Sequence, residues 1–173
     1  MTKATGQQQI GQRVLITGGA SGIGQVLAAR FAAAGAQVAI CDADAGAITA
    51  MASGAPEILA RQADVTDEAQ MQAFLAEVET VWGGGDVVCA NAGTGGPAGR
   101  IEDLSYEDWQ SCLAVNLNGA FLTCRWASRV MRGQGAGLIL ITSSTAGLFG
   151  YPLRSPYAAA KWGLDGLMKP LAM

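Results

Sequence analysis

The chain has 173 residues, of which 50% are hydrophobic and 14% are charged, and this composition excludes an intrinsically disordered protein. The net charge of −3 and the lack of Lys/Arg clusters longer than a pair argue against a nucleic-acid partner. No run of about 18 apolar residues is present, so the sequence predicts no membrane span. We therefore expect a cytoplasmic protein that forms a single domain over residues 1–173.

Short apolar segments alternate with longer Ala- and Leu-rich segments, after a polar tail over residues 1–12 that lacks the apolar core of a signal peptide. Strands are predicted at 13–17, 37–41, 57–64, 86–91 and 137–142. Helices are predicted at 22–34, 45–53, 68–82, 104–132 and 156–169. The strand segments are almost continuously hydrophobic, which is typical of strands buried on both faces of a parallel sheet. The alternation predicts an α/β fold with a doubly wound parallel sheet.

Glycines join the first predicted strand to the first predicted helix in VLITGGASGIG, residues 14–24. Gly18, Gly22 and Gly24 have the spacing G-x-x-x-G-x-G. In such a turn the first glycine permits a sharp bend, the second leaves room for a pyrophosphate, and the third lets the helix pack closely on the sheet. The free N–H groups at the helix start then face the anion. The position between strand and helix predicts a Rossmann-type dinucleotide site, whereas an ordinary tight turn would leave the glycines without a ligand.

The second predicted strand is followed by Asp42, which lies 18 residues after Gly24. A carboxylate at this point can accept hydrogen bonds from the adenosine ribose and repels a 2′-phosphate. Neither Ala43 nor Ser21 offers a positive charge to such a phosphate. The sequence therefore favours NAD over NADP, unless Asp42 is only a solvated turn residue or a helix cap.

The predicted helix 104–132 carries apolar residues around most of its circumference. These are Leu113, Val115, Leu117, Phe121, Leu122, Trp126, Val130 and Met131. A helix that is apolar on more than one face lies in a core or at a subunit interface. A homo-oligomer is one interpretation of this pattern.

The four cysteines are Cys41, Cys89, Cys112 and Cys124, and none of them forms a C-x-x-C pair. The chain contains no histidine, so these cysteines make a poor zinc site. We expect reduced, mostly buried cysteines and no metal.

The segment SPYAAAK, residues 155–161, places Tyr157 and Lys161 four residues apart and therefore on one face of a helix. Pro156 suits an early helical position, where its missing N–H is not needed. A free phenol titrates at about pH 10, but a nearby ammonium and a positively charged oxidised nicotinamide would both favour its anion. The pair predicts that Tyr157 moves a proton. An Ala-rich helix that carries Y-x-x-x-K by chance is the alternative.

Together these motifs resemble the short-chain dehydrogenase/reductase family, in the branch with T-G-x-x-x-G-x-G and Y-x-x-x-K. The matching segments are TGGASGIG (17–24), ADV (63–65), ANAG (90–93), VNLNG (115–119) and ITSSTAG (141–147). The family's N-N-A-G motif, which lines the cofactor floor, has Ala90 in place of its first asparagine. The family's serine lies thirteen residues before the tyrosine, which selects Ser144 over Ser143.

The resemblance implies an oxidoreductase that transfers a hydride between NAD and a small alcohol, sugar or 3-oxoacyl substrate. It implies that Tyr157 is the acid–base group, Ser144 holds the substrate oxygen, Lys161 contacts the nicotinamide ribose, and Asn116 anchors a water. It implies cofactor contacts from Thr17, Gly18, Ser21, Gly22, Ile23, Gly24, Asp42, Asp64, Val65, Asn91, Gly93, Tyr157 and Lys161. A homodimer or homotetramer is also implied.

Members of this family are usually longer than the present chain. We therefore expect the last strands of the family fold, the loop over the nicotinamide and most of the substrate lid to be missing, and residues 1–173 alone to turn over slowly. Pro170 falls where the family's last helix here normally continues, and a proline inside a helix costs about 3 kcal/mol.

Two segments, 94–104 and 147–156, are expected to border the active site and to offer Arg100, Phe149, Tyr151 and Arg154. We interpret Arg154 as a solvated surface arginine, with contact to an anionic substrate as the alternative.

Other functions fit the sequence less well. A non-catalytic NAD-binding regulator or an inactive fragment would keep the fold, but regulators of this kind tend to lose the Ser, Tyr and Lys set that is intact here. A serine hydrolase is excluded because the chain has neither G-x-S-x-G nor a histidine. The related sugar-nucleotide epimerases use a G-x-x-G-x-x-G turn, which this sequence does not match.

Overall fold

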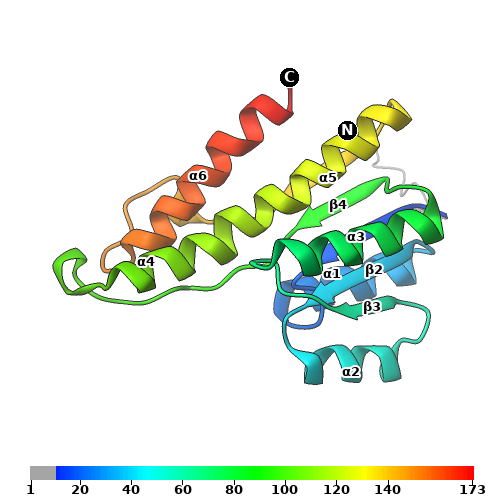
Figure 1. The fold of residues 1–173 in the computed structure, drawn as a ribbon, viewed down its shortest axis with the longest axis horizontal. Coiled ribbons are helices and arrows are strands. Elements are labelled where there is room, and N and C mark those ends of the chain that lie inside the picture. The colour runs from blue at the N-terminus through cyan, green and yellow to red at the C-terminus, as the bar shows by residue number, and fades with distance from the viewer. Residues whose placement is uncertain (1–10) are drawn as a thin grey trace, which may run out of the picture.

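The computed structural model describes residues 11–173 and contains one parallel sheet with helices on both sides (Figure 1). The strands are β1 (Arg13–Thr17), β2 (Gln37–Asp42), β3 (Leu59–Gln62), β4 (Val87–Ala90) and β5 (Leu138–Ile141). Their order across the sheet is β3-β2-β1-β4-β5, and every neighbouring pair runs parallel. The chain reverses its direction of winding between β1 and β4, which confirms the predicted doubly wound α/β fold.

Six α-helices lie within residues 11–173; the last follows β5, and the others lie between successive strands. They are α1 (Gly22–Ala33), α2 (Ala45–Gly54), α3 (Glu68–Trp82), α4 (Tyr106–Leu113), α5 (Gly119–Gln134) and α6 (Ser155–Leu171). Short 3₁₀ turns lie at Ile101–Asp103 and Thr145–Gly147. Local sequence sets the limits of α3, because the Asp67 carboxylate accepts the free N–H groups of Ala69 and Gln70 and Gly83 ends the helix with a φ of 72°.

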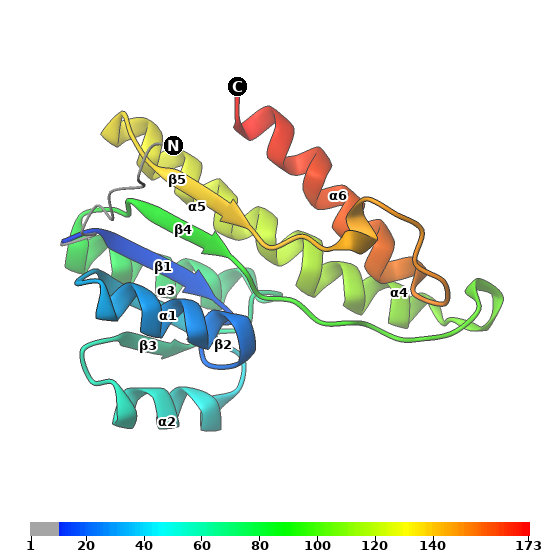
Figure 2. The same ribbon diagram turned by 180° about the vertical axis from the view of Figure 1, so that it is seen from behind.

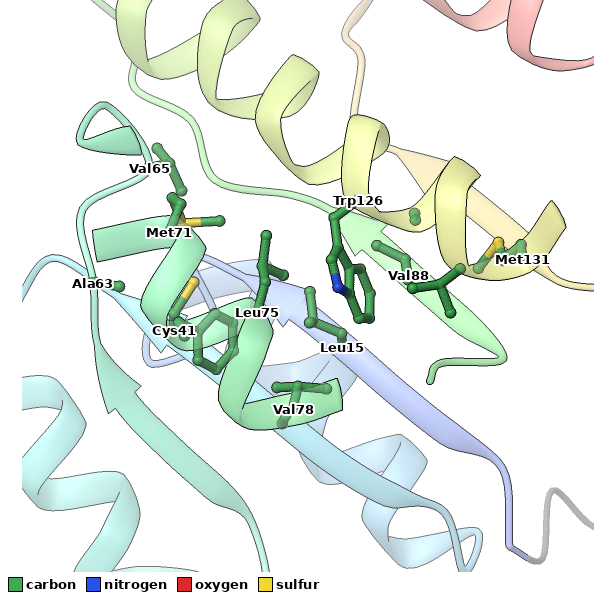
Figure 3. Close-up of a cluster of buried hydrophobic side chains, with 14 residues drawn as sticks. Leu15, Cys41, Ala63, Val65, Met71, Leu75, Val78, Val88, Trp126 and Met131 are labelled. Atoms are coloured by element: carbon green, nitrogen blue, oxygen red, sulfur yellow. The ribbon is translucent and has the colours of Figure 1, made fainter. Parts of the chain in front are cut away.

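Alternate strand residues face two separate cores, as expected for side chains that alternate across a sheet. On one side Leu15 and Val88 pack against Leu75 and Val78 of α3 and Trp126 of α5 (Figure 3). On the other side, seen in front in Figure 2, the strands pack against α1 and α2. Each large aliphatic side chain buried in this way contributes about 1.5–3 kcal/mol, so the two cores hold the sheet in place beneath the functional site.

Strand β5 corrects the expectation that every strand is buried on both faces. Ile139 and Ile141 pack towards α5 and α6, but Leu138 and Leu140 are 51% and 43% exposed. These two leucines are paired in register with Val87 and Cys89, on the side of α1 and α2. Within residues 11–173, β5 is an edge strand whose apolar side chains are covered on one face only.

The predicted single helix 104–132 is wrong in its detail, because a π-helical segment, Ala114–Asn118, separates α4 from α5. The side-chain amide of Asn116 donates to the carbonyl of Cys112, 3.0 Å away, which in a regular helix would bind the backbone N–H of Asn116. At the end of the segment, the N–H of Gly119 binds the carbonyl of Ala114, five residues earlier. The buried amide thus accompanies the change of helical register.

The other elements lie close to their predicted ranges. The strand predicted at 57–64 is shortened to β3, and α6 continues through Pro170 to Leu171. This proline stands in the last, exposed turn, where the loss of one backbone hydrogen bond does not end the helix earlier. All four cysteines are free and buried, as predicted. The predicted polar tail lies almost wholly outside the described residues.

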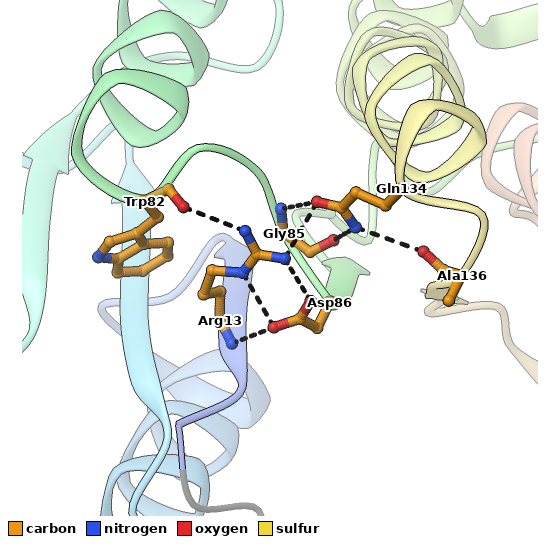
Figure 4. A network of polar contacts seen from close by, with 6 residues as sticks. All are labelled: Arg13, Trp82, Gly85, Asp86, Gln134 and Ala136. Carbon is orange, nitrogen blue, oxygen red and sulfur yellow. Dashed lines mark hydrogen bonds and ion pairs between the residues drawn. The ribbon is translucent and has the colours of Figure 1, made fainter.

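A network of polar side chains lies at the end of the sheet opposite the functional site (Figure 4). The Arg13 guanidinium binds the Asp86 carboxylate with a shortest distance of 2.5 Å and also donates to the carbonyl of Trp82 and to Gln134 Oε1. Gln134 in turn pairs with both backbone groups of Gly85. The network joins β1, the start of β4 and the ends of α3 and α5.

No helix in the described part of the chain has the length and apolarity needed to cross a membrane.

Candidate active site

A cavity of about 500 Å³ opens at the carboxyl ends of the strands, across the point where the sheet changes winding direction. It is lined by Gly18, Ser21, Gly22, Ile23, Gly24, Asp42, Ala43, Ala63, Asp64, Val65, Asn91, Ala92, Gly93, Thr94, Gly95, Val115, Asn116, Thr142, Ser143, Tyr157 and Lys161. Every predicted cofactor or catalytic residue except Thr17 and Ser144 is in this lining. The cavity thus brings together residues that are more than 140 positions apart in the sequence.

The glycine turn forms one end of the cavity. Gly18 and Gly22 have φ values of 62° and 51°, in the left-handed region that favours glycine. A Cβ on Gly24 would collide with the carbonyl oxygen of Gly18, so this position permits the close approach of α1 to β1. Ser21 makes no capping hydrogen bond with its side chain, and the first turn of α1 carries no acidic residue. The N–H groups and positive dipole end of α1 are therefore available to an anion in the cavity.

Asp42 lines the cavity at the end of β2. Its Oδ2 accepts the N–H of Ala20 at 3.1 Å, and its Oδ1 accepts the N–H of Asp44 at 3.2 Å. The cap of α2 is Asp44, whose carboxylate accepts the N–H of Ala47. The helix-cap alternative for Asp42 is therefore wrong, and its half-buried carboxylate faces the cavity beside the glycine turn.

The side chain of Asn91 connects the segments that form the floor of the cavity. Its Nδ2 donates to the carbonyls of Thr17 and Gly18, at 3.0 and 3.2 Å, and its Oδ1 accepts the hydroxyl of Thr142 at 3.1 Å. The Thr17 hydroxyl oxygen accepts the N–H groups of Asn91 and Ala92. One amide thus ties the ends of β1, β4 and β5 together. Thr17 itself is buried beneath the floor, which explains why it does not line the cavity.

Lys161 and Tyr157 lie together on the first turns of α6. The side chain of Lys161 is buried, with an exposed fraction of 3%, and its Nζ donates to the carbonyl of Thr142 at 2.8 Å. The same Nζ is 5.5 Å from the centroid of the Tyr157 ring. Burial lowers the pKa of Lys161 from the ordinary 10.5, because water solvates the ammonium poorly there. A poorly solvated positive charge interacts more strongly with any anion that forms beside it.

Asn116 is buried in the π-helical segment and holds the next part of the wall. Its Oδ1 accepts the N–H of Thr94 at 3.2 Å, and its Nδ2 donates to the Thr94 carbonyl at 3.0 Å. A Cβ built on Gly93 would lie 3.0 Å from Asn116 Oδ1 and 3.6 Å from Lys161 Nζ. Asn116 and Lys161 therefore approach the same glycine from two elements.

The two serines after β5 differ in their surroundings. Ser144 precedes the 3₁₀ turn, and its Oγ accepts the N–H of Ala146 at 3.1 Å, which leaves its O–H free to donate. Ser143 lines the cavity, and its buried Oγ has no hydrogen-bond partner within residues 11–173. The Ser144 O–H is therefore free to donate, and the neighbouring Ser143 hydroxyl is unpaired among the described residues.

Arg154 is not simply a solvated surface arginine, as one interpretation of the sequence had it. Its Nη1 donates to the carbonyls of Gly95 and Gly96, at 2.9 and 2.8 Å, so the guanidinium is held by the protein backbone. The alternative, contact with an anionic substrate, stays open, because these bonds use Nη1 alone. By contrast, Arg100 is 74% exposed, and Phe149 and Tyr151 are 67% and 50% exposed.

Sequence reasoning missed eight lining residues: Ala43, Ala63, Ala92, Thr94, Gly95, Val115, Thr142 and Ser143. Six of them adjoin a predicted site residue, and Gly95 and Thr142 lie two residues from one, so closeness to the matching segments was an available signal. Thr142 links two predicted site residues, because its carbonyl binds Lys161 and its hydroxyl binds Asn91. The contact of Lys161 with the Thr142 carbonyl could not be inferred from the sequence, because every residue type has the same backbone carbonyl.

Comparison with known proteins agrees with this geometry. The family model described as short chain dehydrogenase matches residues 12–173. Levodione reductase of Leifsonia aquatica is 36% identical over 166 residues, which cover 92% of this chain and 62% of that protein. D-threitol dehydrogenase of Mycolicibacterium smegmatis is 36% identical over 168 residues, with 94% and 64% covered.

Solved structures show the same fold. The crystal structure of levodione reductase superposes with a TM-score of 0.86 at 36% identity, over 93% of this chain and 65% of that one. A short-chain type dehydrogenase/reductase from Mycobacterium marinum gives 0.88 at 33% identity, over 95% and 69%. The chain spans about three fifths of the length of the curated relatives it matches.

Proposed function

The chain belongs to the short-chain dehydrogenase family, and from that premise we propose that it is an oxidoreductase that transfers a hydride between NAD and the carbinol or carbonyl carbon of a small alcohol, sugar or 3-oxoacyl substrate. The observation that carries the proposal is the buried Lys161 ammonium, 5.5 Å from the Tyr157 ring centroid, in the cavity that also contains the glycine turn.

In the proposed reaction the phenol oxygen of Tyr157 takes the proton from the substrate hydroxyl, or returns it to the carbonyl oxygen in reverse. Lys161 favours the anionic form of this phenol because its charge is close and poorly solvated. Ser144 donates its free O–H to the same substrate oxygen and fixes its position. Asn116 holds the Thr94 backbone beside Lys161 and anchors a water through which the lysine exchanges protons with solvent.

The lining of the cavity fits a nicotinamide dinucleotide. The open N–H groups at the start of α1 suit a pyrophosphate, Asp42 suits the adenosine ribose hydroxyls, and Asp64 and Val65 suit the adenine. When bound, the dinucleotide supplies the hydride acceptor or donor. The Asp42 carboxylate lies where a 2′-phosphate would meet a negative charge, so we propose NAD in preference to NADP.

The remaining aspects of the proposal concern the whole protein. We infer a cytoplasmic enzyme that acts on a small-molecule substrate as a homodimer or homotetramer, with residues 1–173 as one dinucleotide-binding domain. The support for the oligomer is Phe121 of α5, an apolar side chain that is 46% exposed.

The test is a Tyr157→Phe variant, assayed at 340 nm with NAD and with NADP against a panel of alcohols, sugars and 3-hydroxyacyl thioesters. We expect kcat to fall by at least about a hundredfold, because general acid–base catalysis contributes about 10²–10⁴-fold. The affinity for NAD, measured by calorimetry, should stay within about threefold of the parent. Turnover of the parent with NAD should exceed that with NADP.

Tyr151→Phe is the matched control, since this second tyrosine has its ring centroid 6.2 Å from that of Tyr157 but is half exposed. It should retain most of the activity. Equal rates for Tyr157→Phe and the parent would remove Tyr157 from its role. Binding of NAD without turnover on any substrate would instead favour the non-catalytic regulator.

A further inference from the structure

Arg154 connects two segments of the chain at the mouth of the cavity. Its backbone carbonyl accepts the N–H of Ala158 and so begins α6, the helix that carries Tyr157. Its side chain extends away from the helix and donates from Nη1 to the carbonyls of Gly95 and Gly96. A Cβ on Gly95 would lie 3.4 Å from that nitrogen, which is an ordinary van der Waals distance.

The residue before Arg154 adds a third hydrogen bond to the same segment. The carbonyl of Leu153 accepts the N–H of Gly99 at 3.0 Å. Leu153 has a φ of 61°, which is uncommon for a residue with a side chain and is kept only where surrounding contacts hold it. Two consecutive residues thus bind both ends of the segment 95–99.

The same segment also contacts α4 and the π-helical segment. Asn116 binds both backbone groups of Thr94. Gly96 has a φ of 64°, and a Cβ there would lie 2.5 Å from the Sγ of the buried Cys112. The segment 94–99 therefore contacts Cys112 and Asn116 as well as Leu153 and Arg154. Thr94 and Gly95 form part of the cavity wall.

We infer that Arg154 is a positioning residue that clamps the segment 94–99, one wall of the cavity, to the helix start that carries Tyr157. The inference rests on the proposed function, because the clamp fixes the distance between the phenol and the wall against which a substrate lies. The two glycine carbonyls bind Nη1 alone, and the clamp that they form requires no charge on the substrate. We therefore expect Arg154 to act on neutral and anionic substrates alike.

The experiment compares Arg154→Ala, Arg154→Lys and the control Arg100→Ala in the full-length protein. Arg100 directly follows the segment 94–99 but is 74% exposed, and its ion pair with Glu102 is long, at 3.9 Å. Hydrogen–deuterium exchange is measured on peptides that cover residues 94–100, and kcat and KM are measured with a neutral and an anionic substrate. Circular dichroism melting reports on global folding.

For Arg154→Ala we expect at least about tenfold faster exchange in residues 94–100 and no change in the peptides of the glycine turn. We expect kcat to fall by about tenfold or more for both substrates, with KM for NAD unchanged, because misplacement near the reacting atoms reduces the rate rather than the affinity for a distant ligand. Arg154→Lys, which can reach one carbonyl, should restore part of both effects. Arg100→Ala should match the parent.

Unchanged exchange in residues 94–100 of a folded Arg154→Ala variant would overturn the clamp. A rise in KM for the anionic substrate alone would also overturn it, since that result assigns Arg154 to substrate binding. Lack of turnover in the parent would count against the proposed function only, because the exchange measurement decides the clamp independently. If Arg154→Ala does not fold, the exchange of the Arg154→Lys variant decides in its place.

Discussion

The hydroxyls of Ser143 and Ser144 differ in what they can do for the protein and for a substrate. Ser144 accepts the N–H of Ala146 and keeps its own O–H for a partner outside the turn. The Ser143 hydroxyl is buried and unpaired among the described residues. A buried polar group without a partner lowers stability, so the two side chains should respond differently to removal.

We predict that Ser144→Ala lowers kcat by about tenfold or more and lowers the free energy of unfolding by about 1 kcal/mol, because it removes the proposed substrate contact and the cap of a turn. Ser143→Ala should reduce kcat much less and leave the protein equally or more stable. Steady-state kinetics and urea denaturation of both variants check this. A larger loss of kcat in Ser143→Ala than in Ser144→Ala would assign the substrate contact to Ser143 instead of Ser144.

At this scale the sequence predicted side chains well and backbone partners poorly. Tyr157 and Lys161 line one cavity, as their spacing suggested, together with Asn116, which the family resemblance had indicated. The position of Arg154 could not be predicted, because its partners are glycine carbonyls about 60 positions away, and a carbonyl is the same in every residue.

Among the elements, the ends of β1, β4, α3 and α5 are joined through Arg13 and Asp86. The side chains are 23% and 33% exposed, so water screens the pair only in part. The Arg13 guanidinium lowers the pKa of Asp86 from its ordinary 3.8, mainly through its hydrogen bond to the carboxylate. The ionised form is therefore favoured in the folded protein.

We predict that Asp86→Asn lowers the free energy of unfolding by about 1–2 kcal/mol at neutral pH, because it weakens a charge-assisted pair that is partly exposed. The stabilisation by Asp86 should be fully present above the ordinary pKa of 3.8 and be lost as the pH falls through the lower pKa of the folded state. The difference between parent and variant should therefore shrink below about pH 4. Urea denaturation as a function of pH measures it.

Glu77→Gln provides the control for this prediction, since Glu77 pairs with Arg61 at 2.5 Å but both side chains are more exposed, at 36% and 47%. Its effect should stay within about 0.5 kcal/mol. Equal effects of the two variants would show that burial of the Arg13–Asp86 pair is irrelevant.

Element prediction succeeded where a pattern extends over many residues. The range of α3 follows from its caps and periodicity, and β1 begins and ends as predicted. The π-helical segment Ala114–Asn118 was not predictable, because the side chain of Asn116 alters the register only in contact with the Cys112 carbonyl and the distant Thr94. Tertiary contact, rather than local propensity, decides that region.

On the scale of the whole molecule the sheet has two different edges. Strand β3 is polar at Arg61 and Gln62, while β5 presents Leu138 and Leu140 on a face that no helix within residues 11–173 covers. An apolar edge strand is a site where chains associate. The sequence could predict the strand, but its burial depends on what lies beside it, which a hydrophobic run does not reveal.

We predict that Leu140→Lys in residues 1–173 reduces self-association, measured by sedimentation velocity, and changes the free energy of unfolding by less than about 1 kcal/mol. Ile139→Lys is the matched control on the other face, where Ile139 packs against the core, and should destabilise the protein by about 2 kcal/mol or more. Unaltered association in Leu140→Lys would show that the β5 leucines do not attract other chains.

The amide of Asn91, bound at once to Thr17, Gly18 and Thr142, has a thermodynamic consequence. A ligand that arrives there meets a surface already in its bound shape, so association sacrifices little conformational entropy. The heat-capacity change on binding should then equal that expected from the apolar area removed from water, without the excess that marks coupled folding.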